Sequence, residues 1–178
     1  NLGEAMAIWA PDVVVETGDI TNAPDDYPIE YLYAYNYFLS LGLPLIIANG
    51  NHDHGNLALW KQYFGALFTD VNWMGAHFIQ INTATSSGVS GRAVNWALSL
   101  MNRYFGDPIF LNCHIPLIDI NARQAQSYGA VLMEAMINNG GTAVLQGHNH
   151  YDMVMDANKA LPIYLDLVKN LETCGKFT

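Results

Sequence analysis

The chain has 178 residues, of which 51% are hydrophobic, and this length and apolar content predict one globular domain with a sizeable core and exclude a disordered chain. Its 16 acidic and 7 basic residues give a formal net charge of −9, which disfavours nonspecific binding to a nucleic-acid backbone. No uninterrupted apolar stretch approaches the roughly 18 residues that a membrane-spanning helix needs, so no membrane span is expected.

Helical periodicity and short apolar runs alternate along the first part of the chain. Leu2, Ala5, Met6 and Trp9 recur at helical spacing, and the run Val13-Val14-Val15 that follows them is typical of a buried strand. The same patterns continue up to residue 67. They predict helices at 2–10, 27–41 and 56–67, and strands at 12–16 and 44–48.

The expected helix at 27–41, with the sequence YPIEYLYAYNYFLSL, is aromatic nearly all round. Such a helix is either buried on more than one side, between a sheet and a neighbouring loop, or presents a surface to a partner.

The second part of the chain predicts further strands. We expect two strands at 71–83, a helix at 91–105, a strand at 108–113, a helix at 121–138, and strands at 142–146, 151–156 and 161–168. Strands that alternate with helices and then follow one another predict an α/β fold whose sheet is completed by antiparallel pairing.

Four of the predicted strands are each followed by residue types that bind metals. These four segments are Gly18-Asp19, Gly50-Asn51-His52-Asp53, His114 and Gly147-His148-Asn149-His150. In an open α/β sheet, ligands bind beyond the carboxyl ends of the strands, so the four segments are expected to converge on one crevice.

The residue types in these segments suit a site that holds two metal ions. Imidazole nitrogens bind transition metals, a carboxylate can bridge two cations, and the Asn side chain offers a neutral oxygen. Two ions about 3.5–4 Å apart would clamp a phosphate and lower the pKa of a bound water, which then attacks as hydroxide.

Each segment has a structural reading when taken alone. Gly, Asp and Asn are common in turns, and a single His at a strand end is more often a hydrogen-bonded structural residue than a ligand. The four segments together favour the metal site, because turn chemistry would rarely place a metal-binding residue after four separate apolar runs.

Two other residues are assigned to the structure rather than to the site. His77 lies in an alternating segment typical of a hairpin strand, outside the four segments. Cys113 directly precedes His114 and should therefore point to the opposite face of its strand, as a small core residue.

The motifs GD, GNHD, H and GHNH, in this order from about Pro11 to about Tyr151, resemble those of the calcineurin-like metallophosphoesterase superfamily. The segment GRAVNWALSL, at 91–100, also resembles a family helix with a central Trp. The resemblance implies one metallophosphoesterase-like domain over residues 1–178, folded as a four-layer α/β/β/α sandwich.

The same resemblance implies a role for each motif residue. Asp19 would bridge both ions, Asn51, His114 and His148 would complete the sphere of one ion, and His150 would bind the other. His52 would donate a proton to the leaving group or stabilise the transition state, with Asp53 orienting it. His54 has no counterpart in the motif and is given only a possible place in the pocket.

The chain departs from the family pattern at its beginning. The family's first motif, an Asp-x-His pair that supplies two further ligands from the first strand, does not occur before Asp19, and residues 1–10 resemble the helix that follows that strand. We therefore expect an amino-terminally truncated domain that lacks its first strand, with about a strand and a loop more in the natural protein, or another chain in that place.

The expected function is hydrolysis of a small phosphate mono- or diester by a metal-bound hydroxide. The cofactors would be two divalent or trivalent transition-metal ions, namely manganese, iron, zinc, cobalt or nickel. Asn22 stands where a purple acid phosphatase has its Tyr ligand, so a purple enzyme in the strict sense is not expected. The alternatives are a truncated or non-catalytic scaffold that binds a protein partner, and a hydrolase that uses a single metal.

Overall fold

The computed structural model describes residues 2–22, 27–84, 89–119, 124–125, 129–150 and 154. Its elements, in chain order, are α1 (Leu2–Trp9), β1 (Val14–Glu16), α2 (Ile29–Ser40), β2 (Leu45–Ile47), the 3₁₀ helix η1 (His52–Asn56), α3 (Leu57–Tyr63), β3 (Thr69–Trp73), β4 (Ala76–Gln80), α4 (Gly91–Arg103), β5 (Ile109–Asn112), β6 (Ile118–Asp119), β7 (Gln124–Ala125), α5 (Gly129–Asn138) and β8 (Ala143–Leu145).

The longer strands form two sheets. β1 and β2 pair in parallel, and the second sheet has the order β3-β4-β5-β8. In the second sheet, the β3–β4 pair is an antiparallel hairpin, whereas β4, β5 and β8 run parallel. The short strands β6 and β7 form a separate antiparallel pair.

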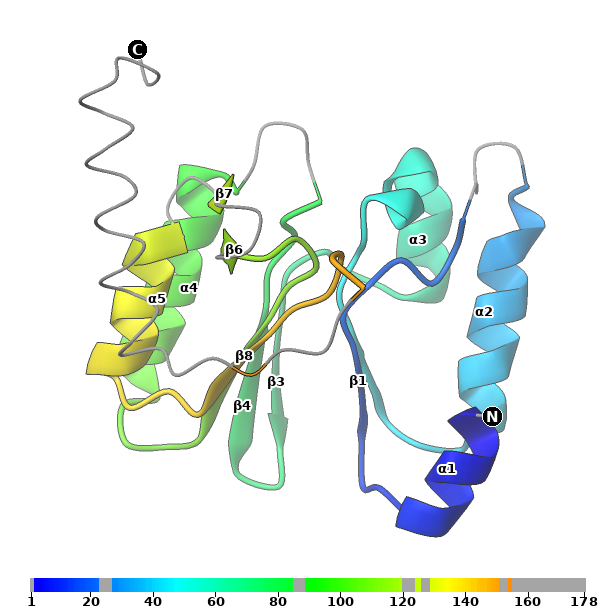
Figure 1. Cartoon of the computed structure of the whole chain (residues 1–178), viewed down its shortest axis with the longest axis horizontal. Coiled ribbons are helices and arrows are strands. Elements are labelled where there is room, and N and C mark those ends of the chain that lie inside the picture. The colour runs from blue at the N-terminus through cyan, green and yellow to red at the C-terminus, as the bar shows by residue number, and fades with distance from the viewer. Residues whose placement is uncertain are drawn as a thin grey trace.

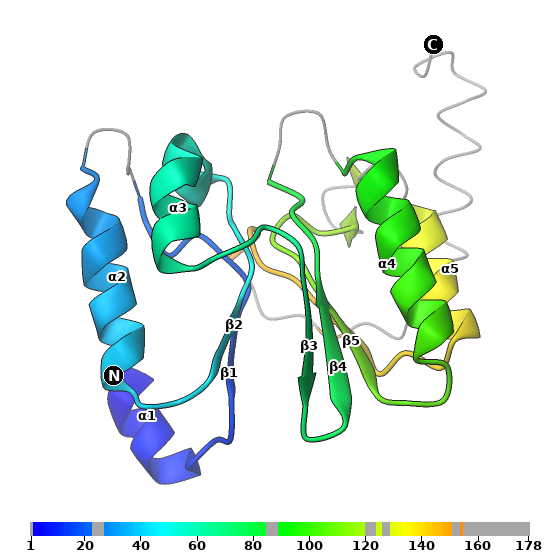
Figure 2. The ribbon, with the colours of Figure 1, turned by 180° about the vertical axis from the view of Figure 1, so that it is seen from behind.

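The two sheets lie between two layers of helices. Figure 1 shows α4 and α5 on the outer side of the β3-β4-β5-β8 sheet, and α2 and α3 on the outer side of the β1-β2 sheet. The same order of layers is visible from behind in Figure 2, where β2 lies beside β1. The predicted α/β fold, with four layers in the order helix, sheet, sheet, helix, is confirmed.

The larger core lies between α4, α5 and the second sheet. Strand alternation points Ile79 and Leu111 toward these helices, where they pack with Ala97 and Leu132. α4 begins where the Ser90 hydroxyl accepts a hydrogen bond from the Ala93 amide, 3.3 Å away, so its N-terminus is capped.

The smaller core lies between α2, α3 and the first sheet. Tyr31 and Phe38 of α2 pack with Ile47 of β2 and with Trp60 of α3, which is fully buried. One side of the aromatic helix is therefore buried against the sheet and α3, whereas the expected burial on more than one side is not seen among the described residues. Its other side is exposed, and includes Tyr33.

The inner face of the second sheet is directed toward β1. Phe78 and Phe110 stack there with ring centroids 4.9 Å apart, and the Asn112 amide donates a hydrogen bond to the Glu16 carbonyl over 3.1 Å. This contact joins the two sheets next to the carboxyl end of β1.

One predicted helix is shorter than expected. Residues 121–138 were expected to be helical, but Gln124–Ala125 pairs with Ile118–Asp119 as strand, and α5 begins only at Gly129. The prediction was wrong at residues 124–125 because pairing with a neighbouring strand outweighs the helix preference of Gln and Ala.

The strands expected at 151–156 and 161–168 lie outside the described residues, apart from Val154, which is in neither helix nor strand. None of the helices in the described ranges has the length and hydropathy needed to span a bilayer.

Candidate metal centre

Four loops meet beyond the carboxyl ends of β1, β2, β5 and β8, which are the loops that carry the four predicted segments. Backbone hydrogen bonds hold them together past the ends of the strands. The Ala48 amide donates to the Glu16 carbonyl over 2.9 Å, and the Gly147 amide donates to the His114 carbonyl over 3.0 Å. The convergence predicted from the strand pattern is therefore present.

The first two loops approach each other at glycines. Gly18 has φ +102°, and a Cβ at this position would lie 2.7 Å from the Gly50 nitrogen and 2.8 Å from Nδ1 of His114. A Cβ at Gly50 would lie 2.2 Å from both the nitrogen and Oδ1 of Asp19. The loops can reach this separation only without side chains at these two positions.

His114 lies at the centre of the converging loops and is almost fully buried. Its Nδ1 lies 2.8 Å from the Thr17 carbonyl oxygen. A carbonyl can only accept, so Nδ1 carries the proton and donates this hydrogen bond. In the neutral ring, Nε2 then has a free electron pair.

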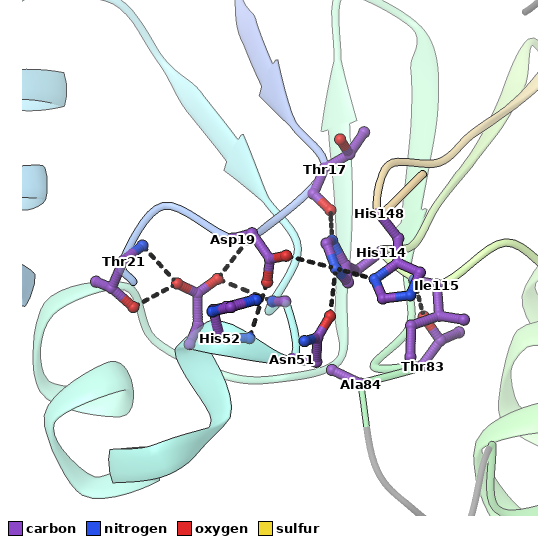
Figure 3. Close-up of polar contacts among 12 residues, drawn as sticks. Thr17, Asp19, Thr21, Asn51, His52, Thr83, Ala84, His114, Ile115 and His148 are labelled. Carbon is purple, nitrogen blue, oxygen red and sulfur yellow. Dashed lines mark hydrogen bonds and ion pairs between the residues drawn. The ribbon is translucent and has the colours of Figure 1, made fainter. Parts of the chain in front are cut away.

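Three further ligand atoms surround Nε2 of His114, as Figure 3 shows. Oδ1 of Asn51 lies 2.9 Å from it, Oδ2 of Asp19 lies 3.1 Å away, and Nδ1 of His148 lies 3.2 Å away. The ligand atoms of Asp19, His114 and His148 all lie within 4.8 Å of one another. These are four of the five predicted metal-binding residues.

The environment of His114 favours a metal ion over a proton at this point. Burial lowers the pKa of His114, against the opposing effects of the Thr17 carbonyl and the Asp19 carboxylate, so the neutral ring is favoured. A single proton, whether on Nε2 or on Nδ1 of His148, can bridge Nε2 to only one of the three surrounding atoms. A cation bound among all four atoms would satisfy each of them, and the mixed nitrogen and oxygen set suits a transition metal.

Three residues of the motifs have positive φ values, which residues other than Gly rarely adopt. They are Asp19 at 60°, His148 at 72° and His150 at 53°. Such conformations cost on the order of 1 kcal/mol or more, and they persist where the surrounding structure fixes them. Each of the three is a predicted metal ligand, which is consistent with strain held at a functional site.

The buried Asp53 ties the first two loops together. One carboxylate oxygen, Oδ2, accepts hydrogen bonds from the amides of Asp19 and Gly50 over 2.7 and 2.9 Å. The other, Oδ1, accepts from the amide and the hydroxyl of Thr21 over 2.8 and 2.7 Å. Tyr31 also donates to the Asp53 carbonyl over 2.6 Å. Asp53 therefore sets the position of the Asp19 loop.

The His52 ring is held by a backbone carbonyl. Its Nδ1 lies 3.0 Å from the Asn22 carbonyl oxygen, so this nitrogen donates and Nε2 is left for other contacts. The hydrogen bonds of the Asp53 carboxylate go to Asp19, Gly50 and Thr21. Asp53 thus acts on the Asp19 loop beside His52, and its role in orienting His52 stays a prediction.

The backbone of His52 also contacts the cluster. Its amide donates to Oδ1 of Asp19 over 2.9 Å, while Oδ2 of the same carboxylate faces His114. His52 thus directs Asp19, and its exposed side chain lies beside that carboxylate in the same groove.

A groove of about 700 Å³ opens next to the cluster. Its lining includes Asp19, His52 and His150 from the loops, and Tyr33 and Tyr37 from α2. His150 is exposed and does not belong to the compact group formed by Asp19, His114 and His148. The structure therefore brings His150 to the site's groove but leaves it outside the four-atom cluster.

The remaining candidates lie where the sequence indicates. His77 is on β4, stacked on Tyr104 with ring centroids 3.5 Å apart, and its Nε2 lies 3.2 Å from the Asn72 amide nitrogen. Cys113 is fully buried in the larger core, and burial raises its pKa to about 12. His54 contacts Oδ1 of the buried Asn49 over 3.1 Å, which is a structural contact beneath the loop.

Three positioning residues were missed by sequence reasoning. Thr17 and Asn22 act through backbone carbonyls, which fix the ring nitrogens of His114 and His52. Any residue type can supply a carbonyl, so the sequence carries no signal for them. Thr21 binds Asp53 through its hydroxyl as well, and its place two residues after Asp19 is a signal that could have been used.

Comparison with known proteins identifies the family. The family model described as calcineurin-like phosphoesterase matches residues 3–152, which is most of the chain and includes all four loops. No curated protein matches the sequence. Members of this family are typically metal-dependent, in agreement with the cluster of Asp19, His114 and His148. This chain belongs to the calcineurin-like phosphoesterase family.

Proposed function

We propose that this protein is a metal-dependent hydrolase of phosphate mono- or diesters, whose metal ligands include Asp19, Asn51, His114 and His148. The single observation that carries the proposal is the convergence of three electron-pair donors on Nε2 of a buried, neutral His114. Bound metal would polarise the phosphoryl group and lower the pKa of the attacking water.

Other residues of the chain hold the proposed metal ligands in position. Thr17 keeps the proton of His114 on Nδ1, so that Nε2 stays available as a ligand. Asp53 and the His52 amide hold Asp19 in its positive-φ conformation. These contacts support a site that is arranged before substrate binds, which lowers the cost of ordering it during the reaction.

His52 is proposed as the group that donates a proton to the departing alcohol. Its Nδ1 donates to the Asn22 carbonyl, which leaves Nε2 as the nitrogen to carry a second proton. Its exposed side chain lies in the groove that also contains Asp19. A donor in this place can reach the leaving-group oxygen of a phosphate bound at the cluster.

His150 is proposed as a ligand of a second ion. It lines the same groove as Asp19, and Asp19 is the residue that would be shared between two ions. The described residues gather one compact ligand set, which keeps the single-metal hydrolase as the second candidate. His150→Ala distinguishes them, since a dinuclear enzyme should lose orders of magnitude in rate and a mononuclear one should lose little.

The proposal is tested with His52→Ala and a series of aryl and alkyl phosphates whose leaving groups differ in pKa. General acid catalysis typically contributes about 10²–10⁴-fold, and it helps poor leaving groups most. The loss should therefore be large for an alkyl phosphate and small for 4-nitrophenyl phosphate. His77→Ala, at a structural histidine, serves as the control.

Two results would contradict the proposal. An equal loss of rate for all leaving groups in His52→Ala would show that His52 is not the proton donor. Absence of metal-dependent turnover for every mono- and diester in the wild-type protein would instead favour the scaffold.

A further inference from the structure

The groove beside the cluster has an aromatic wall that the proposed chemistry does not use. Tyr33 and Tyr37 of α2 both line it, together with Ala34 and Phe38 of the same helix. Tyr33 is 66% exposed and Tyr37 is 42% exposed, although the Tyr37 ring also meets Phe38 edge-on with ring centroids 5.7 Å apart.

The spacing of these residues gives the wall its shape. Tyr33 and Tyr37 are four positions apart and therefore lie one above the other on the helix surface. Ala34 and Phe38 form a second row beside them. The small Ala34 lies between larger aromatic neighbours in the same wall.

The charges around the groove restrict what can bind. The groove is lined by two acidic residues, Asp19 and Glu30, and by no Lys or Arg in the described part of the chain. Glu30 accepts a hydrogen bond from the Asn22 amide over 2.7 Å, which keeps its carboxylate at the groove. A second anionic group on the substrate would be repelled by the Glu30 carboxylate at the groove.

The position of His52 connects the wall to the reaction. His52 lines the groove together with Tyr33 and Tyr37, and it is the proposed proton donor to the departing alcohol. The alcohol part of the ester therefore extends into the groove while the phosphate is held at the cluster.

We infer that the enzyme prefers phosphate esters of aromatic alcohols that carry no further anionic group, and that Tyr33 and Tyr37 form the surface that recognises the aromatic group. The inference rests on the proposed function, since it assigns the leaving-group side of that same site. Binding energy from a group remote from phosphorus can be used to raise the rate at the reacting centre.

The first test compares the Tyr33→Ala/Tyr37→Ala double variant with wild type on phenyl phosphate and methyl phosphate. For each substrate, kcat/KM of the variant is divided by kcat/KM of the wild type. This ratio removes the difference in intrinsic reactivity between the two leaving groups. A pocket contact of this kind changes selectivity by about 10–200-fold, so kcat/KM for phenyl phosphate should fall at least about tenfold. The value for methyl phosphate should change less than about threefold.

Leu39→Ala is the matched control. Leu39 belongs to the same helix and is 65% exposed, but it does not line the groove. It should leave the ratio of the two substrates unchanged. An equal fall for both substrates in the double variant would overturn the inference.

The second test does not depend on turnover. Binding of phenylphosphonate and methylphosphonate to the metal-loaded protein is measured by calorimetry, since neither compound can be hydrolysed at its P–C bond in this reaction. We expect phenylphosphonate to bind at least about tenfold more tightly in wild type, and this preference to disappear in the double variant.

The two tests separate the inference from the proposed function. A preference for phenylphosphonate that needs Tyr33 and Tyr37 supports the aromatic site even if no ester is hydrolysed. Equal binding of both phosphonates in wild type, or a preference that survives in the double variant, overturns it even if the protein is an active phosphoesterase.

Discussion

Replacing Asp53 with Asn should destabilise the protein, because four hydrogen bonds end on this buried carboxylate. The Asn side-chain oxygen can still accept the hydrogen bonds from the amides of Asp19 and Gly50. The new NH₂ group then faces Thr21. The Thr21 hydroxyl can rotate and accept from that group, but the Thr21 amide loses its acceptor.

The size of the effect follows from these contacts. A buried amide left without an acceptor costs about 1–3 kcal/mol. The two remaining hydrogen bonds lose their charged acceptor, which weakens each by about 0.5–1 kcal/mol. We therefore expect the free energy of unfolding of Asp53→Asn to fall by about 2–5 kcal/mol.

The measurement is urea denaturation of the chelator-treated protein, so that loss of bound metal does not add to the result. Asp70→Asn is the control, since Asp70 is exposed and its hydrogen bond from the Tyr104 hydroxyl can be kept by an amide oxygen. It should change the free energy by less than about 0.5 kcal/mol. A similarly small change in Asp53→Asn would refute the assignment of Asp53 as the link between the loops.

Two further substitutions test the packing and the electrostatics of the same loops. Gly50→Ala places a Cβ 2.2 Å from the nitrogen and Oδ1 of Asp19, so it should displace the Asp19 carboxylate. A metal titration should then show affinity weakened at least about tenfold. Unchanged affinity would contradict the close approach of the two loops. Burial raises the pKa of the Glu16 carboxyl, so the folded state keeps the carboxyl proton to higher pH than the unfolded state. The free energy of unfolding therefore falls as pH rises from 4.5, the unfolded value, through the folded pKa. Glu16→Gln should therefore raise the stability of the metal-free protein at pH 7 but not below the unfolded pKa, and an equal effect at both pH values in urea denaturation would count against burial as the cause.

The parts of the fold predicted correctly are those with strong local patterns. The apolar runs before Asp19, Asn51, His114 and His148 gave the right strands, since buried parallel strands require continuous apolar residues. The convergence of the four loops then followed from the geometry of parallel strands, whose carboxyl ends lie at one edge.

The errors come from interactions that a linear pattern does not carry. Residues 124–125 have good helix formers around them, but they pair with residues 118–119 instead. His52 and Asp53 are adjacent in sequence, yet both lie in η1, where successive side chains project about 120° apart. Their side chains therefore make different contacts, His52 with the Asn22 carbonyl and Asp53 with the amides of Asp19 and Gly50.

The aromatic pattern of α2 was informative but ambiguous. The sequence could not separate burial on several sides from an exposed surface, because Tyr serves both purposes. The structure resolves the pattern into a buried pair, Tyr31 and Phe38, and a row that lines the groove, Tyr33 and Tyr37.

The most direct measurement is metal content per chain, by elemental analysis of protein purified without chelator, for wild type, His114→Ala and the control His77→Ala. The account predicts at least one equivalent of transition metal in wild type and His77→Ala, and its loss in His114→Ala, because the four ligand atoms meet at His114. Metal retained in His114→Ala at the wild-type level, or no metal in wild type even after reconstitution, would contradict the metal centre.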